Sequence, residues 1–196
     1  YSSAASDVYK RQTRAYNEQG NVTFYQHEVV GAKLVRRRLR KLKFPKKTNH
    51  EISQLVYLHM RFHGYGEGKW TDSAVRRYVN DAGDLLERLN KIVRADCTTR
   101  NRRKAARLAR ACDSLEARIK ELAEQEDLAR VRPDLDGNEI MEILDLKPGK
   151  EVGQAWNYLK ELRLESGPLE REDAILALKK WWYEQSGEQA ESESES

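Results

Sequence analysis

The sequence predicts an all-α fold, and three observations support that prediction. Apolar residues recur at spacings of three and four through most of the chain, which is the period of a helix with one buried face. No series of alternating apolar and polar residues interrupts this pattern, as it would in a protein built from strands. The four prolines and the glycine clusters fall between the helical segments, where helices end.

Apolar periodicity predicts four helices in the first half of the chain. They are expected at residues 27–42, from residue 48 or 49 to just before Gly64, at 71–79 and at 85–93. Val30, Leu34 and Leu42 are expected to face inward on the first of them, and Pro45 follows its end. Before this helix we expect at most a short extended piece near Thr23–Tyr25.

A long charged helix is expected at residues 105–131, followed by three shorter ones at 139–144, 151–164 and 172–183. The long helix carries an apolar seam with spacings of four, three, four and three, formed by Leu108, Cys112, Leu115, Ile119 and Leu122. Such a narrow seam is typical of a coiled coil. A coiled-coil interaction protein built on this helix is therefore one alternative.

Composition excludes several classes of protein. The chain has 196 residues, of which 35% are charged and 39% hydrophobic, and no apolar run approaches the roughly 18 residues that a membrane span needs. The first residues contain no apolar signal-peptide core. Two cysteines are too few for a disulfide-stapled scaffold, so we expect a cytoplasmic protein.

Charge is segregated along the chain, although the formal net charge is only +4. Residues 33–47 contain nine lysines or arginines and no acid, and residues 91–110 contain eight against one. Residues 184–196 carry five glutamates and no base. Basic blocks on helices predict a phosphate-binding surface, whereas the alternative is a solvated face whose charge is balanced in three dimensions.

Three polar residues occupy positions where an apolar residue is expected on a helix face: His27, His59 and Asp96. An inward carboxylate is costly unless it is paired or bound to a metal, and two histidines with an aspartate can ligate a divalent ion. Alternatively, each histidine is a hydrogen-bonded core residue and Asp96 pairs with Arg94 or Arg100.

Other candidates for chemistry are weaker. His59 and His63 are four residues apart, but Gly64 follows at once and no zincin-type glutamate accompanies them. Cys97 lies among basic residues that could lower its pKa, yet it has no histidine partner nearby in the sequence. The chain contains no Walker loop, no GxGxxG and no GxSxG motif.

The last third of the chain offers helix starts that suit phosphate binding. Asp136–Asn138 and Lys147–Lys150 each lead directly into a predicted helix, where free backbone N–H groups can face a phosphate. Glycine at 137 and 149 permits close approach of a nucleic-acid backbone, and we expect positive φ at Gly149. Ordinary helix capping requires the same residues and is the alternative.

Six segments together resemble the C-terminal part of bacterial CCA-adding tRNA nucleotidyltransferases, of the poly(A)-polymerase-like class. The resemblance covers about residues 13–182 and is carried by 27–32 (HEVVGA), 58–66 (LHMRFHGYG), 70–78 (WTDSAVRRY), 94–101 (RADCTTRN), 132–141 (RPDLDGNEIM) and 152–156 (VGQAW). It implies a truncated HD-type helical domain followed by a helical tRNA-binding body and tail. His27, His59 and Asp96 would be the remaining HD-type metal ligands, although Gln26 stands where a second histidine usually precedes His27.

The sequence and the resemblance together predict an organisation of the chain. Residues 1–12 are similar to a translated sequencing adapter and are expected to be a non-native leader. We then expect a partial HD-type domain at 13–104, the long helix at 105–131, an RNA-binding domain at 132–184 and a disordered acidic tail at 185–196.

In such an enzyme, C, C and A are added to tRNA 3′ ends from CTP and ATP with Mg²⁺. We expect this chain to supply tRNA binding and part of the HD site, while the residues of nucleotidyl transfer lie upstream. The residues expected to contact RNA are Arg36, Arg37, Arg38, Arg40, Lys41, Lys43, Arg100, Arg102, Arg103, Lys104, Gly137, Asn138, Lys147, Gly149 and Lys150. An HD phosphohydrolase and a stand-alone helical RNA-binding module remain alternatives.

Overall fold

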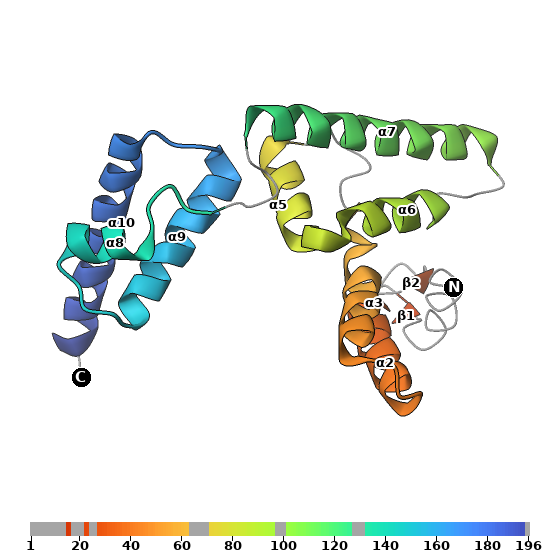
Figure 1. Ribbon diagram of the computed structural model, residues 1–196, viewed down its shortest axis with the longest axis horizontal. Coiled ribbons are helices and arrows are strands. Elements are labelled where there is room, and N and C mark those ends of the chain that lie inside the picture. Colours follow the sequence, from red (N-terminus) through yellow and green to blue (C-terminus); the bar gives the residue numbers. More distant parts are fainter. Residues whose placement is uncertain are drawn as a thin grey trace. The chain divides into compact units, whose positions relative to one another are not determined.

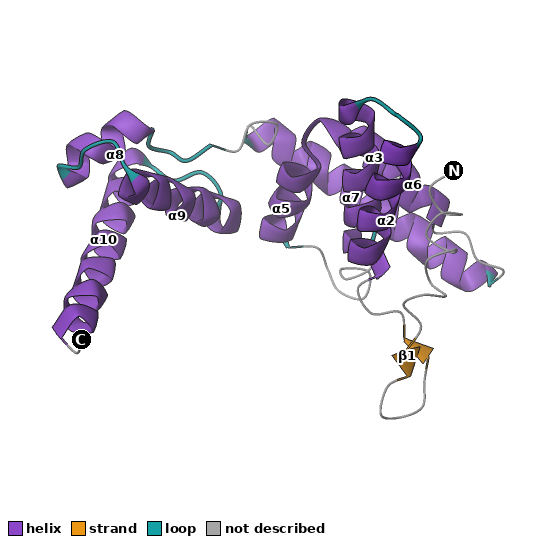
Figure 2. Ribbon diagram, turned by 90° about the horizontal axis from the view of Figure 1, so that it is seen from below, coloured by secondary structure: helices purple, strands orange, loops and turns teal. Residues whose placement is uncertain are grey.

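The computed structural model describes residues 15–16, 22–23, 27–62, 71–96, 101–126 and 132–194, and it confirms the all-α prediction (Figure 1). The helices are α2 (His27–Lys41), α3 (Lys46–Leu58), α5 (Asp72–Ala82), the 3-10 helix η1 (Gly83–Leu85), α6 (Leu86–Asp96), α7 (Arg102–Gln125), α8 (Gly137–Leu144), α9 (Lys150–Ser166) and α10 (Arg171–Ser194). Two strands of two residues each, β1 (Ala15–Tyr16) and β2 (Val22–Thr23), pair antiparallel with Ala15 opposite Thr23 (Figure 2).

The chain divides into two compact units, which are described one at a time. The first comprises residues 1–70 and 81–120, and the second comprises residues 71–80 and 121–196. The domain limits that the sequence predicts at residues 104 and 131 stay predictions, and the expected leader at 1–12 lies outside the described residues. In the part that the structure describes, no helix combines the length and the apolar character that crossing a bilayer requires.

In the first unit, α2 and α3 form a tight helical hairpin whose turn is fixed by backbone hydrogen bonds. The Phe44 N–H donates to the Leu39 carbonyl at 3.0 Å and the Lys43 N–H to the Arg40 carbonyl at 3.1 Å. This is a Schellman motif, and Lys43 occupies its left-handed position with φ 59°. The turn ends α2 one residue before the predicted end, so Leu42 is 53% exposed and the expectation that it faces inward is wrong.

The start of α3 also differs from the prediction. The helix begins at Lys46 rather than at a cap on Thr48 or Asn49, because Pro45 precedes it with φ −53°, a value suited to a helix start. Asn49 instead lies in the first turn and donates from Nδ2 to the Arg36 carbonyl at 3.0 Å. The buried side of α3 carries Leu55 and Val56, as the periodicity predicts.

The long helix α7 spans residues 102–125 rather than 105–131. Its predicted apolar seam is largely buried within the chain, with Cys112, Leu115 and Leu122 each at most 3% exposed. Because these three side chains are buried within the chain, they are not available to a second copy. This burial counts against the coiled-coil alternative.

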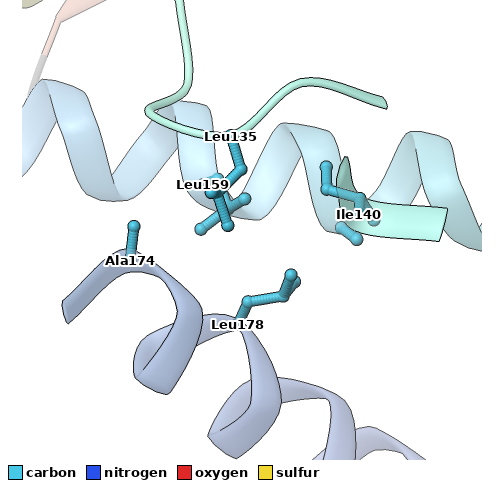
Figure 3. Close-up of a cluster of buried hydrophobic side chains, with 6 residues drawn as sticks. Leu135, Ile140, Leu159, Ala174 and Leu178 are labelled. Carbon is cyan, nitrogen blue, oxygen red and sulfur yellow. The ribbon is translucent and has the colours of Figure 1, made fainter. Parts of the chain in front are cut away.

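The core of the second unit joins α8, α9 and α10. Figure 3 shows Leu135, before α8, and Ile140, within it, converging with Leu159 of α9 and with side chains of α10. The cluster consists of Leu135, Ile140, Ala155, Leu159, Ala174 and Leu178, each at most 2% exposed. The predicted helices at 139–144, 151–164 and 172–183 are therefore confirmed as elements, since their apolar faces form this core.

The last helix extends further than the sequence predicts. We expected it to end near Tyr183 and residues 185–196 to be disordered, whereas α10 continues to Ser194. The glutamates, the two glutamines and the alanine after Tyr183 have favourable helix propensities, which the sequence prediction did not weigh.

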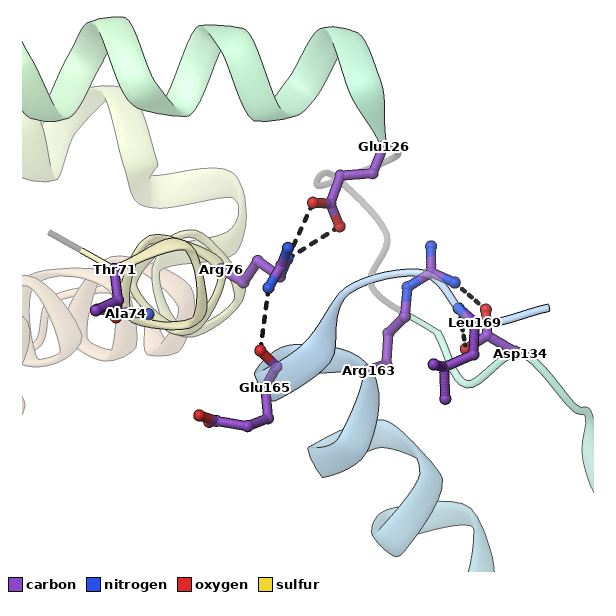
Figure 4. Close-up of polar contacts among 8 residues, drawn as sticks. All are labelled: Thr71, Ala74, Arg76, Glu126, Asp134, Arg163, Glu165 and Leu169. Atoms are coloured by element: carbon purple, nitrogen blue, oxygen red, sulfur yellow. Dashed lines mark hydrogen bonds and ion pairs between the residues drawn. The ribbon is translucent and has the colours of Figure 1, made fainter. Parts of the chain in front are cut away.

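A buried ion pair connects α5 to the residue after α7 within the second unit (Figure 4). Arg76 donates from Nε to both carboxylate oxygens of Glu126, at 3.0 and 3.1 Å, and from Nη1 to the Glu165 carbonyl at 3.2 Å. The two paired side chains are only 8% and 6% exposed. Gly167 is required beside them, because its φ is +85° and a Cβ there would lie 2.7 Å from Arg76 Nη2.

We predict that Arg76→Leu lowers the free energy of unfolding by about 3–5 kcal/mol, since it leaves the Glu126 carboxylate buried without a partner. The matched control is Arg77→Leu, which breaks pairs with the exposed carboxylates of Glu161 and Glu165 and should cost at most about 1 kcal/mol. Urea denaturation followed by tryptophan fluorescence reports on this unit, where α9 and α10 carry three tryptophans. Equal losses for the two variants would contradict the prediction.

Candidate nucleic-acid interface

Six basic side chains of the first unit project into solvent from the last turns of α2 and the turn that follows. This α2 basic surface consists of Arg36, Arg37, Arg38, Arg40, Lys41 and Lys43, all of them exposed. The helix forms with this sequence because Val35 and the half-buried Leu34 and Leu39 supply its apolar face. Basic residues in its last turn also interact favourably with the negative end of the helix dipole.

The α2 basic surface has no acidic partner among the described residues, and this distinguishes it from seven arginines elsewhere in the described chain. Seven arginines elsewhere lie against carboxylates, namely Arg61, Arg76, Arg77, Arg88, Arg94, Arg163 and Arg171. Glu116 and Asp113, for example, bind Arg94 by hydrogen bonds that raise its pKa. The alternative of a charge balanced in three dimensions is therefore not what the described part of the chain shows on α2.

The second basic block begins α7. Arg102, Arg103 and Lys104 are exposed there, and no acidic residue lies in the first turn. The Asn101 side chain caps the helix, because its Oδ1 accepts from the N–H groups of Arg103 and Lys104 at 3.1 Å. The three positive side chains lie at the positive end of the helix dipole, and this arrangement is electrostatically unfavourable. A bound anion would relieve the repulsion. Arg100 lies outside the described residues.

The start of α8 is an ordinary capped helix rather than an open phosphate site. Asp136 Oδ1 accepts from the N–H groups of Asn138 and Glu139, at 2.8 and 2.9 Å. Glu139 accepts in return from the Asp136 N–H at 2.8 Å, and this hydrogen bond, with Arg171 nearby, lowers the pKa of Glu139. Two carboxylates occupy the helix start, and the Asn138 N–H that we expected to be free is already bonded to Asp136.

The start of α9 differs from that of α8. Gly149 precedes the helix without a side-chain cap, and Lys147 and Lys150 are exposed on either side of it. The φ of Gly149 is −173°, which any residue can adopt, so the expectation of positive φ is wrong. A Cβ at Gly149 would instead meet the Glu151 carboxylate at 2.8 Å, which places an acid among the two lysines.

Two of the three candidate metal ligands lie together in the first unit. His59 Nδ1 donates to the Val56 carbonyl at 2.5 Å, so in the neutral imidazole Nε2 carries the lone pair. Nε2 lies 3.9 Å from Asp96 Oδ2, and both side chains are largely buried. Arg94 binds Glu116 and Asp113, not Asp96 as the alternative proposed.

The third candidate, the His27 side chain, lies outside the described part of the chain, as do His63 and Cys97. Within the described residues, no group of three or more histidine, cysteine, aspartate or glutamate side chains is arranged to hold a metal. The donor set that can be observed is therefore one imidazole nitrogen and one carboxylate, which suits a divalent ion but does not complete its coordination.

The sequence reasoning missed a hollow between α2 and α3. It measures about 440 Å³ and is lined by Arg36, Arg40, Phe44, Lys46, Asn49 and His50. We missed it because the start of α3 was predicted too late, which removed Lys46 from the helix. The signal was available, since proline is favoured at helix starts and predicts that Pro45 begins α3 rather than only ending α2.

Comparisons with known proteins agree with the resemblance seen in the sequence. The chain is 33% identical over 177 residues to a CC-adding tRNA nucleotidyltransferase of Thermus thermophilus, an alignment that covers 89% of this chain and 38% of that protein. It is 31% identical over 158 residues to an A-adding tRNA nucleotidyltransferase of Deinococcus radiodurans, covering 80% of this chain and 35% of that protein. No family model and no solved structure matches.

The chain spans little more than a third of the length of these two relatives, while the alignments take in most of its own residues. Two relatives from different organisms, each above 30% identity, carry the same enzyme class in their names. On this evidence the chain belongs to the tRNA nucleotidyltransferase family.

Proposed function

We propose that this chain docks tRNA for a tRNA nucleotidyltransferase that acts in the cytoplasm, with ATP and CTP as the nucleotides added. The α2 basic surface and the start of α7 bind phosphates of the tRNA backbone. Lys147 and Lys150, beside the uncapped start of α9, add contacts from the second unit. This chain contributes binding and orientation of the tRNA, and nucleotide transfer belongs to other parts of the enzyme.

One observation carries the proposal: the α2 arginines are exposed and lack carboxylate partners among the described residues, whereas seven other arginines have them. Neighbouring cations repel one another, and at 4 Å in water this costs about 1 kcal/mol for each pair of unit charges. A polyanion removes that repulsion when it binds. Guanidinium groups suit phosphate in particular, because their paired N–H donors match two phosphate oxygens.

The pairing of His59 with Asp96 supports a second element of the proposal, a weak divalent-metal site of the HD type. His59 would bind through Nε2 and Asp96 through its carboxylate, with His27 as the third ligand. Mg²⁺ would serve nucleotide transfer elsewhere in the enzyme. The same pair would suit an HD phosphohydrolase, but the similarity to two tRNA nucleotidyltransferases favours a role in that enzyme class.

The charge proposal predicts the salt dependence of tRNA binding. Each neutralised phosphate contributes roughly −0.7 to −0.9 to the slope of log affinity against log salt, so about four contacts weaken binding roughly a hundredfold for a fourfold rise in salt. The double reversal Arg37→Glu and Arg40→Glu removes two contacts and should make the slope shallower by about 1.4–1.8. Filter binding of tRNA at several salt concentrations measures both quantities.

The matched control is Lys179→Glu with Lys180→Glu on α10, where both lysines are exposed. Each double reversal takes the formal net charge from +4 to zero, so only the position of the change differs. The control should keep most of the wild-type slope. If the two double variants bind alike, binding depends on net charge alone and the α2 basic surface is only a solvated face.

The metal proposal predicts weak binding, because only part of a ligand set is present. In isothermal titration calorimetry, Mn²⁺ should not saturate the chain at equimolar metal, and Asp96→Asn should abolish the remaining heat. Asp84→Asn, an exposed aspartate of η1, is the control and should leave the heat unchanged. Tight equimolar binding, or equal heats for Asp96→Asn and the unaltered chain, would contradict the proposal.

A further inference from the structure

The hollow between α2 and α3 has walls of two different chemical kinds. Arg36 and Arg40 line it from α2, and Lys46 and His50 line it from α3. Phe44, in the turn between the helices, lines it as well and remains 46% exposed. Its volume of about 440 Å³ falls within the range of small-molecule sites.

The electrostatic environment of the hollow favours an anion. None of its lining residues is acidic. The first turn of α3 contains Lys46 and Lys47 but no acid, and no side chain caps the N-terminus of this helix. Uncapped N–H groups at the positive end of a helix dipole, with lysines beside them, are stabilised when a phosphate binds.

The Phe44 ring favours a nucleotide over a simple anion as the ligand of the hollow. An exposed phenylalanine beside two arginines is the combination that binds unpaired nucleotides, because a base stacks on the ring while the guanidinium groups hold its phosphate. An inorganic anion would gain nothing from Phe44. A base within a duplex could not reach the ring, since both of its faces are already stacked on neighbouring bases.

Hydrogen bonds in and next to its lining preorganise the hollow. Asn49, a buried lining residue, donates from Nδ2 to the Arg36 carbonyl at 3.0 Å and thereby fixes α3 against α2. Ser53 donates to the Asn49 carbonyl at 2.6 Å. The Schellman turn and Pro45 hold the backbone on both sides of Phe44. A site held rigid in this way loses little conformational entropy on binding.

We propose that this hollow binds a single nucleotide, with the phosphate on Arg36, Arg40 and Lys46 and the base stacked on Phe44. This inference rests on the proposed RNA-binding function, which supplies the reason to expect RNA as the nucleic acid. The nucleotide is either an unpaired residue of a bound RNA or a free nucleoside triphosphate, since both present the same base and phosphate groups.

The test measures binding of a short fluorescently labelled single-stranded RNA, and of a duplex of the same length, by anisotropy. Phe44→Leu should weaken binding of the single strand about tenfold, the loss expected for one base–aromatic stack, and should change duplex binding less than twofold. Phe44→Trp should retain single-strand binding. Leu42→Ala, a comparably exposed residue of the same turn, should have no effect.

Addition of unlabelled ATP distinguishes the two sources of the nucleotide. Displacement of the single strand by ATP from the unaltered chain, but not from Phe44→Leu, identifies free nucleotide as a ligand of the hollow, and no displacement identifies an unpaired RNA residue. Circular dichroism of each variant verifies that the helices are intact.

The inference is overturned if Phe44→Leu binds the single strand as tightly as the unaltered chain does. If that result accompanies a large loss in the Arg37→Glu and Arg40→Glu variant, the proposed RNA-binding function stands and only the nucleotide site fails. If neither variant loses affinity, both proposals fail.

Discussion

The turn between α2 and α3 is the constraint on which the basic surface of this protein depends. Hydrogen bonds from Lys43 and Phe44 back to the last carbonyls of α2 end that helix, and Pro45 starts the next one at once. After this short connection α3 lies alongside α2, where Asn49 Nδ2 donates to the Arg36 carbonyl. The apolar side of α2 is thereby covered, and its arginines are left in water.

The resulting concentration of charge differs from the arginines that the fold pairs with carboxylates. Arg76 and Glu126 form a buried pair that stabilises the second unit, and Arg94 is held by two carboxylates on α7. The charges of those arginines are neutralised by carboxylates within the fold. The α2 arginines contribute nothing comparable to stability in the described structure, so their presence is better explained by a ligand that carries the missing negative charge.

Much of the fold could be predicted from the sequence, because apolar periodicity reports directly on helix faces. Leu55 and Val56 on α3, and Cys112 and Leu115 on α7, are buried as their spacing indicates. Boundaries were less predictable, since they depend on competition among local signals. Pro45 acts as a helix start as well as a helix stop, and Leu42 falls in a turn that removes it from the buried face.

The candidate site was predictable in part, for a similar reason. Exposure of the basic block follows from its charge, whereas the absence of carboxylate partners depends on which helices lie nearby, and the sequence does not show this. At α8 the same residues that suit phosphate binding form a capping box, and only the structure shows that Asp136 already accepts from the N–H groups. The approach of His59 to Asp96 needed both helices in place.

Ultraviolet cross-linking of tRNA to the whole chain, followed by mass spectrometry of the linked peptides, tests the central claim most directly. The account predicts cross-links in the peptides that contain the α2 basic surface and Phe44, and further cross-links at the start of α7, all of which fade as salt is raised. Cross-links confined to α8, α9 and α10, with none between residues 36 and 50, would contradict it.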